Sequence, residues 1–264
     1  MKIFDAHVHV FPEKIAEKAT LSTGNYYGVS MYSIGNVENI KKELKKGIIT
    51  KCLIHSTATR ADQVEHINSY IASLVSENEE FVGFGTMHAD YEDIKGEVDR
   101  IIKLGLLGIK LHTDFQGFAI DCEKALPIYE AARGRLPILF HVGDTKSDLS
   151  APERVANICE KYPDLTVIAA HLGGYSVWDR AEEVLVGKYE NLYFDASSSI
   201  DFMDSEQAKR IIKNHGTDKV LFGSDFPMHN PEGTVKKLIA MGFSKKDNEK
   251  MFYKNAEKLL GIKI

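Results

Sequence analysis

The chain has 264 residues, of which 44% are hydrophobic and 27% charged, and its formal net charge is −5. That composition is typical of a globular protein with a sizeable core. Lysine and glutamate are mixed throughout and no strongly basic stretch occurs, so we expect no nucleic-acid partner.

No stretch approaches the ~18 consecutive apolar residues of a membrane-spanning helix, and we expect no membrane association. Asp5 and His7 interrupt the first apolar run, which argues against a secretory signal. The three cysteines, Cys52, Cys122 and Cys159, are widely spaced. We therefore expect reduced thiols in a cytoplasmic protein.

Short apolar runs rich in valine, isoleucine and phenylalanine recur along the chain. Most are continuously apolar, as strands covered on both faces are. The eight runs are residues 3–10, 51–55, 81–87, 107–112, 137–141, 166–171, 191–195 and 220–225. Helical patterns separate them: apolar side chains repeat at helical spacing in residues 64–75, and residues 245–260 form a closing helical segment.

Eight strands that alternate with helices predict an α/β fold, namely a (β/α)8 TIM barrel. We expect residues 1–264 to form a single domain. A doubly wound open sheet is the alternative. That fold usually has fewer strands, and no Gly-x-Gly-x-x-Gly turn follows the first strand here.

The first connection, residues 11–50, is unusually long and contains Tyr26, Tyr27 and Tyr32. Loops of such length in a compact domain are often functional. The segment follows the C-terminal end of the first strand, the face on which barrel enzymes keep their active sites. We interpret it as a substrate-covering loop, with a tolerated insertion as the alternative.

Histidine and aspartate gather at the predicted strand ends. His7 and His9 are two residues apart on the first strand, so their side chains point to the same face. The ends of strands two to eight carry His55, His88, His112, His141, His171, Asp195 and Asp225. Imidazole and carboxylate together suit zinc and similar ions, so the pattern predicts a metal site at the mouth of the barrel.

Six short motifs occur in order: Asp5-Ala-His-Val-His9, Gly108-Ile-Lys-Leu-His112, Leu139-Phe-His141, Ala170-His-Leu-Gly-Gly174, Phe222-Gly-Ser-Asp-Phe-Pro227 and Tyr253-Lys-Asn-Ala-Glu-Lys-Leu-Leu260. Together they resemble the amidohydrolase superfamily. The resemblance is greatest to its amidohydrolase-related branch, which includes aminocarboxymuconate semialdehyde decarboxylase and related metal-dependent hydrolases. It extends from residue 3 to the end of the chain.

The resemblance implies one divalent metal, zinc by preference with manganese as the alternative, held by His7, His9, His141 and Asp225. Asp225 would also accept a proton, and His171 would polarise the substrate or shuttle protons. The implied activity is hydrolysis, in which metal-activated water attacks the carbonyl of an amide, lactone or ester of a small molecule.

Two other activities stay open at this point. The same ligand set serves non-oxidative decarboxylation of a small aromatic or unsaturated carboxylic acid. A structural metal closed by four protein ligands, in a barrel without catalytic activity, is the third interpretation. In each case the only other partner that we expect is a second copy of the chain, since symmetric dimers are the commonest oligomers.

Several further side chains at the predicted mouth are candidates for substrate binding. They are Lys110, His112, His55, His88, Arg60, Tyr26 and Trp178. Some superfamily members carry a carboxylated lysine on the fourth strand that bridges two metals, and Lys110 lies on that strand. The branch that this chain resembles generally has one metal, so we expect Lys110 to be unmodified.

Overall fold

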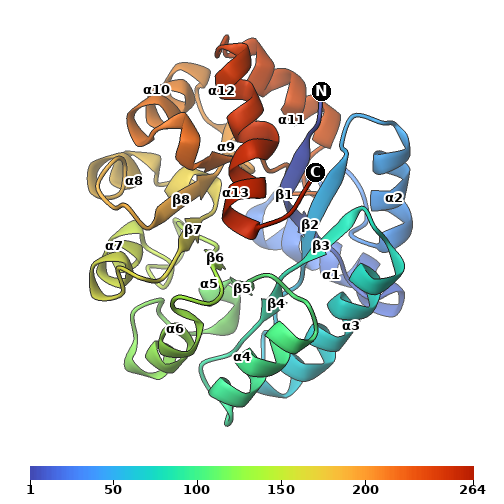
Figure 1. The fold of residues 1–264 in the computed structure, drawn as a ribbon, viewed down its shortest axis with the longest axis vertical. Helices are drawn as coiled ribbons and strands as arrows, with labels where there is room; N and C mark the ends of the chain where they lie inside the picture. The colour runs from blue at the N-terminus through green and yellow to red at the C-terminus, as the bar shows by residue number, and fades with distance from the viewer.

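The predicted apolar runs form parallel strands surrounded by helices in a computed structural model that describes residues 1–264 (Figure 1). The strands are β1 (Phe4–His9), β2 (Lys51–His55), β3 (Phe81–Gly83), β4 (Gly85–Thr86), β5 (Ile109–Leu111), β6 (Ile138–Phe140), β7 (Val167–Ala169), β8 (Leu192–Asp195) and β9 (Val220–Leu221). β3 and β4 are two halves of one predicted strand, interrupted at Phe84, whose amide donates to the Ile54 carbonyl at 3.1 Å.

The first and last strands meet and close the sheet into a barrel. Asp225 N donates to His7 O at 3.0 Å, and His9 N donates to Phe226 O at 2.8 Å. Val8 and Phe226 form a parallel bridge at the same seam. The predicted (β/α)8 barrel is therefore confirmed, and the open doubly wound sheet is excluded.

Helices cover the outside of the barrel and are its main connections. They are α1 (Glu13–Tyr27), α2 (Val37–Lys45), α3 (Val64–Glu77), α4 (Ile94–Lys103), α5 (Thr113–Gln116), α6 (Leu126–Ala132), α7 (Pro152–Lys161), α8 (Trp178–Val184), α9 (Ser199–Phe202), α10 (Ser205–His215), α11 (Pro231–Ala240), α12 (Lys245–Glu249) and α13 (Asn255–Leu260). None of them combines the length and the apolar character that crossing a bilayer requires.

The first connection is not a loop, contrary to the interpretation of the sequence. Residues 11–50 contain α1 and α2, and α1 ends at Gly28, whose φ of 70° lies in the left-handed region that favours glycine. α1 supplies a wall of the main cavity, so the segment lies where the sequence placed it, in helical form. Tyr26 and Tyr27 fall in its last turn.

The barrel has two separate apolar cores. A large cluster lies between the strands and the surrounding helices, and a smaller one fills the barrel interior with Phe4, Leu53, Phe84 and other strand residues. The smaller cluster also contains Ala256 and Ile264, because the chain end at α13 folds back across the barrel (Figure 1). Apolar side chains thus fill that end of the barrel interior, and the candidate active site lies at the opposite end.

We predict that Gly108→Ala destabilises the barrel by about 1–3 kcal/mol, the usual cost of overpacking a core. A methyl group at Gly108 would lie 2.4 Å from Phe84 Cζ, and Phe84 is fully buried. Gly233→Ala in α11 is the matched control: its nearest contact is at 3.7 Å, and we expect stabilisation of up to about 1 kcal/mol from helix propensity. Urea unfolding measures both, and equal stability of the two variants would contradict the prediction.

We further predict that His215 makes stability depend on pH. Its ring is buried and stacks on Phe194 at 3.8 Å, and burial lowers its pKa from 6.5 to about 4. Between these pH values only the unfolded chain takes up the proton, so the free energy of unfolding falls as pH decreases, by up to about 3 kcal/mol. His215→Leu should flatten this dependence in urea titrations at pH 7, 5.5 and 4. Parallel curves for variant and wild type would refute it.

Candidate active site

β1 and the segment that follows β9 bring three predicted ligands together. His7 Nε2 and His9 Nε2 are 3.2 Å apart, and Asp225 Oδ1 lies 3.6 Å from the first and 3.3 Å from the second. Two nitrogen ligands of one tetrahedral zinc ion are ~3.3–3.4 Å apart, since each bond is ~2.0–2.1 Å long. The three atoms therefore have the spacing of ligands that share one cation, and they fit a divalent metal.

Asp195 orients the first of these histidines. Its Oδ2 lies 2.9 Å from His7 Nδ1, and its Oδ1 accepts from Ser197 N at 2.9 Å. Burial alone would raise the pKa of Asp195, but the neighbouring His7 outweighs that effect and lowers it to about 2. A carboxylate on the far nitrogen of a ligand histidine fixes its tautomer and ring orientation. The sequence located Asp195 at a strand end, but its role was missed.

The buried histidines are neutral at physiological pH and so keep a lone pair for a metal. Burial, followed by the charge of Lys110, lowers the pKa of His7 to about 4. Lys110 is itself fully buried, with Nζ 3.4 Å from His7 Nε2, and burial lowers its pKa to about 8. Lys110 thus lies against His7 as a buried cation.

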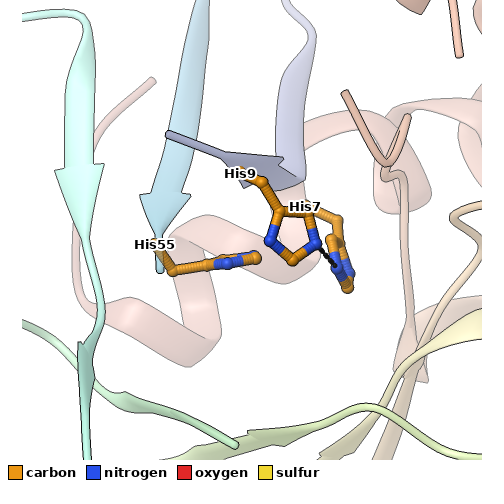
Figure 2. Close-up of side chains that lie close together, drawn as sticks. All are labelled: His7, His9 and His55. Atoms are coloured by element: carbon orange, nitrogen blue, oxygen red, sulfur yellow. Dashed lines mark hydrogen bonds between the residues drawn. The ribbon is translucent and has the colours of Figure 1, made fainter. Parts of the chain in front are cut away.

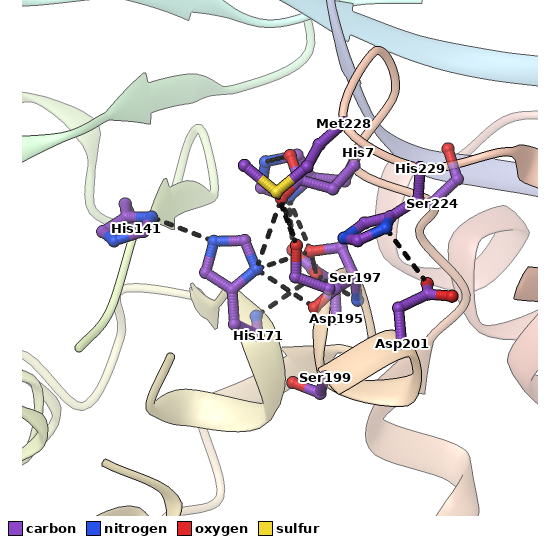
Figure 3. Close-up of polar contacts among 12 residues, drawn as sticks. His7, His141, His171, Asp195, Ser197, Ser199, Asp201, Ser224, Met228 and His229 are labelled. Carbon is purple, nitrogen blue, oxygen red and sulfur yellow. Dashed lines mark hydrogen bonds and ion pairs between the residues drawn. The ribbon is translucent and has the colours of Figure 1, made fainter. Parts of the chain in front are cut away.

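His171 lies between His7 and His141 (Figure 3). Its Nδ1 is 2.9 Å from Ser197 Oγ and 3.9 Å from Asp225 Oδ2, and its Nε2 is 2.9 Å from His141 Nδ1. The other nitrogen of His141 lies 3.0 Å from the Gly143 carbonyl oxygen. His141 therefore reaches the His7–His9–Asp225 group only through His171, and its ligand role stays a prediction.

Backbone strain is concentrated in this group. His171, Ser198 and Asp225 have φ values of 60°, 56° and 62°, in a region that residues other than glycine rarely adopt. Ser198 Oγ donates to Asp225 Oδ2 at 2.5 Å, so two of the strained residues hold each other. Such strain persists only where the surroundings enforce it, and it clusters at functional sites.

A cavity of about 670 Å³ opens above these residues. His9, His141, His171 and Asp225 reach its surface, whereas His7 and Lys110 lie beneath it. One wall is aromatic and comes from Tyr27 of α1, Phe115 and Tyr175. A volume of this size and lining suits a small molecule with a planar or apolar part.

The aromatic wall carries one hydroxyl group between two imidazoles. Tyr27 Oη is 3.0 Å from His112 Nε2 and 3.3 Å from His141 Nε2, and the two imidazole rings stack at 3.9 Å. Tyr26 packs edge-on against Tyr27 and Phe115 at centroid distances of 4.8 and 4.9 Å, and it donates to Asp144 at 2.7 Å. His112 and Tyr26 thus line the cavity, and their role in substrate binding stays a prediction. Tyr27, which the sequence marked only by its place in the first connection, contacts both His112 and His141.

The remaining candidates lie outside the cavity. Arg60 is exposed and pairs with Asp62, and the buried His88 donates to the Gln116 carbonyl at 3.3 Å. Trp178 donates to the His171 carbonyl at 2.9 Å and so supports His171 from behind. These three side chains do not line the cavity, which leaves them no direct contact with a substrate there.

Comparisons with known proteins identify the family. The family model described as Amidohydrolase matches residues 55–262, and the chain belongs to that family. It is therefore an enzyme of the amidohydrolase superfamily, of a family that binds a divalent metal. The comparison with curated proteins gives no match.

Solved structures with the same fold are distant in sequence. 5-Carboxyvanillate decarboxylase from Sphingomonas paucimobilis has a TM-score of 0.76 at 13% identity, with 99% of both chains covered. Dihydroxybenzoic acid decarboxylase from Polaromonas, with bound manganese and the inhibitor 2-nitroresorcinol, has a TM-score of 0.73 at 17% identity, covering 98% of this chain and 97% of that one. A candidate 2-pyrone-4,6-dicarboxylic acid hydrolase from Acinetobacter baumannii has a TM-score of 0.71 at 15% identity, covering 99% and 100%.

We predict that Asp195→Asn weakens binding of Zn²⁺ or Mn²⁺ by about 10–100-fold, the usual effect of removing the partner of a ligand histidine. The amide cannot hold His7 Nδ1 as the carboxylate does. Asp62→Asn, at an exposed aspartate that pairs with Arg60, is the control. Calorimetric titration of metal-depleted protein measures both, and an unchanged affinity in Asp195→Asn would contradict the assigned role.

Proposed function

We propose that this chain is a metal-dependent hydrolase in which water attacks the carbonyl of an amide, lactone or ester of a small molecule. The observation that carries the proposal is the position of Asp225. One carboxylate oxygen faces His7 and His9, the second accepts from Ser198, and the side chain reaches the cavity.

His7, His9 and Asp225 would hold the metal, with His141 as the further ligand that the family resemblance implies. When bound there, a divalent metal supplies positive charge that lowers the pKa of water and polarises a carbonyl. Burial would raise the pKa of Asp225, but the neighbouring His7 and His9 outweigh it and hold the pKa well below its usual range. Asp225 is therefore ionised at neutral pH and able to accept a proton from the attacking water.

His171 and Tyr27 are the groups placed to face the substrate oxygen. The Trp178 indole and the Ser197 hydroxyl hold His171 from two sides, while its ring reaches the cavity. Tyr27 Oη lines the same cavity, 3.3 Å from His141 Nε2. Fixed polar groups of this kind stabilise charge that develops on an oxygen, because they need no reorganisation during the reaction.

Decarboxylation of a small aromatic carboxylic acid is the second candidate. Two of the structural neighbours are decarboxylases of substituted aromatic acids. The wall of Tyr27, Phe115 and Tyr175 could stack on a planar ring. The cavity is lined by no arginine, and its one lysine, Lys14, is exposed at the edge, so a substrate carboxylate beside the aromatic wall would bind at the metal and the histidines.

The test compares metal-depleted enzyme with enzyme reloaded with Zn²⁺ or Mn²⁺ on lactones, aryl esters, amides and aromatic carboxylic acids. We expect acid release from a carbonyl substrate only after metal is restored. Asp225→Asn should lower kcat by about 10²–10⁴-fold, the typical contribution of a general base. Lys14→Gln, at an exposed cavity edge, should leave kcat within about threefold, as screened surface charges contribute little.

Two outcomes would replace the proposal. Metal-dependent release of carbon dioxide from aromatic acids, without hydrolysis, would assign the decarboxylase. Stoichiometric metal binding without turnover of any of the four classes would favour a structural metal.

A further inference from the structure

His55 is fully buried at the end of β2 and has no hydrogen-bond partner on either ring nitrogen. Buried polar groups in folded proteins nearly always have a partner, and an unpaired one costs about 1–3 kcal/mol. An imidazole needs a donor at one nitrogen and an acceptor at the other, and protein atoms supply neither here. An interaction other than a hydrogen bond within this chain must therefore explain why a histidine is buried at this position.

The position of His55 points to the metal-binding histidines. His9 and His55 are direct partners in the parallel pairing of β1 and β2, so strand register brings them to the same level of the barrel. The His55 ring lies edge-on to the rings of His7 and His9, at centroid distances of 4.8 and 4.6 Å (Figure 2). One ligand nitrogen from each of the three histidines lies within 4.8 Å of the other two.

Two ordinary explanations for His55 are disfavoured by its surroundings. It does not line the cavity, so it cannot contact a substrate there. A histidine that serves the core usually bonds to backbone, as the buried His88 does with the Gln116 carbonyl at 3.3 Å and the Asp90 amide at 3.2 Å. His55 makes neither contact, although Lys110 and Asp225 are close enough to influence its charge.

We infer that His55 is a metal ligand, a third imidazole beside His7 and His9 at the closed side of the site. The inference rests on the metal dependence of the proposed function. The present separations of up to 4.8 Å are close to the distance of about 4 Å between two ligand atoms on opposite sides of one metal ion. The metal then satisfies one of the two unpartnered nitrogens of His55, and the site gains a ligand that does not line the cavity.

The test is the Mn²⁺ affinity of chelator-treated protein, measured by calorimetry, in wild type, His55→Leu and His88→Leu. We expect the dissociation constant to rise by about 100-fold or more in His55→Leu. Loss of a residue that only hydrogen-bonds to a metal ligand usually costs about 10–100-fold, and loss of a ligand itself should cost at least as much. His88→Leu, which removes a buried histidine outside the cavity, should bind Mn²⁺ as wild type does. The visible spectrum of bound Co²⁺ should change in His55→Leu only.

Stability of the metal-free proteins separates a ligand from a structural histidine. Without metal, His55→Leu should unfold at the same or a higher urea concentration than wild type, since an unpaired polar group has been removed. At the same high Mn²⁺ concentration, wild type should gain more stability than the variant, because the stabilisation by a bound ligand increases with its affinity for the folded protein.

A direct measurement on the wild type does not depend on the variant folding. In crystals grown with MnCl2, an anomalous difference peak within about 2.0–2.4 Å of a His55 nitrogen would support the inference. A peak within bonding distance of His7 and His9 but not of His55 would overturn the inference about His55. Equal Mn²⁺ affinity of His55→Leu and wild type would also overturn it, and neither result would contradict the proposed hydrolase function. Wild type that binds neither Mn²⁺ nor Zn²⁺ would overturn both.

Discussion

The site depends on the seam at which the barrel closes. Asp5 Oδ1 accepts from Ser224 N at 2.8 Å and Oδ2 accepts from Ser224 Oγ at 2.5 Å, across 219 residues of sequence. These bonds and the backbone pairing beside them hold His7 and His9 against Asp225. Side chains alternate along a strand, so a slip of one residue would turn both histidines away from the carboxylate. The buried Asp5 carboxyl, whose pKa burial raises to about 7, therefore supports the site through backbone, and its Oδ1 also accepts from His7 N at 3.2 Å.

Rigidity at the site comes from strained backbone held by buried polar contacts. His171 and Asp225 both have positive φ, and each is secured by groups that lie outside the reacting region, Trp178 and Ser198. A relaxed backbone would aim these side chains elsewhere, and the surrounding barrel prevents that relaxation. Burial keeps His7 neutral, and the neighbouring histidines keep Asp195 and Asp225 ionised in spite of their burial, which is the combination that a divalent metal requires.

Much of the fold was predictable because its strands are buried on both faces. A continuous apolar run marked each strand of the barrel. Even β3 and β4, the two halves of the third predicted strand, lie within its predicted range. The first connection was interpreted as a loop because α1 contains Gly24, Asn25 and other weak helix formers. Packing over the mouth of the barrel stabilises this helix, as tertiary contacts do for most helices in proteins, and no local pattern records such contacts.

The sequence by itself determined which chemical groups reach the end of each strand: the paired His7 and His9, a histidine on most of the following strands, and a closing aspartate. It could not rank His55, His88 and His112, because all three end strands in the same way. Tertiary structure decided that His112 faces the cavity, His88 bonds to backbone and His55 turns beneath the cavity toward His7 and His9. Strand ends set the position of each Cα, whereas side-chain direction follows from the neighbouring strands and covering helices, which are distant in sequence.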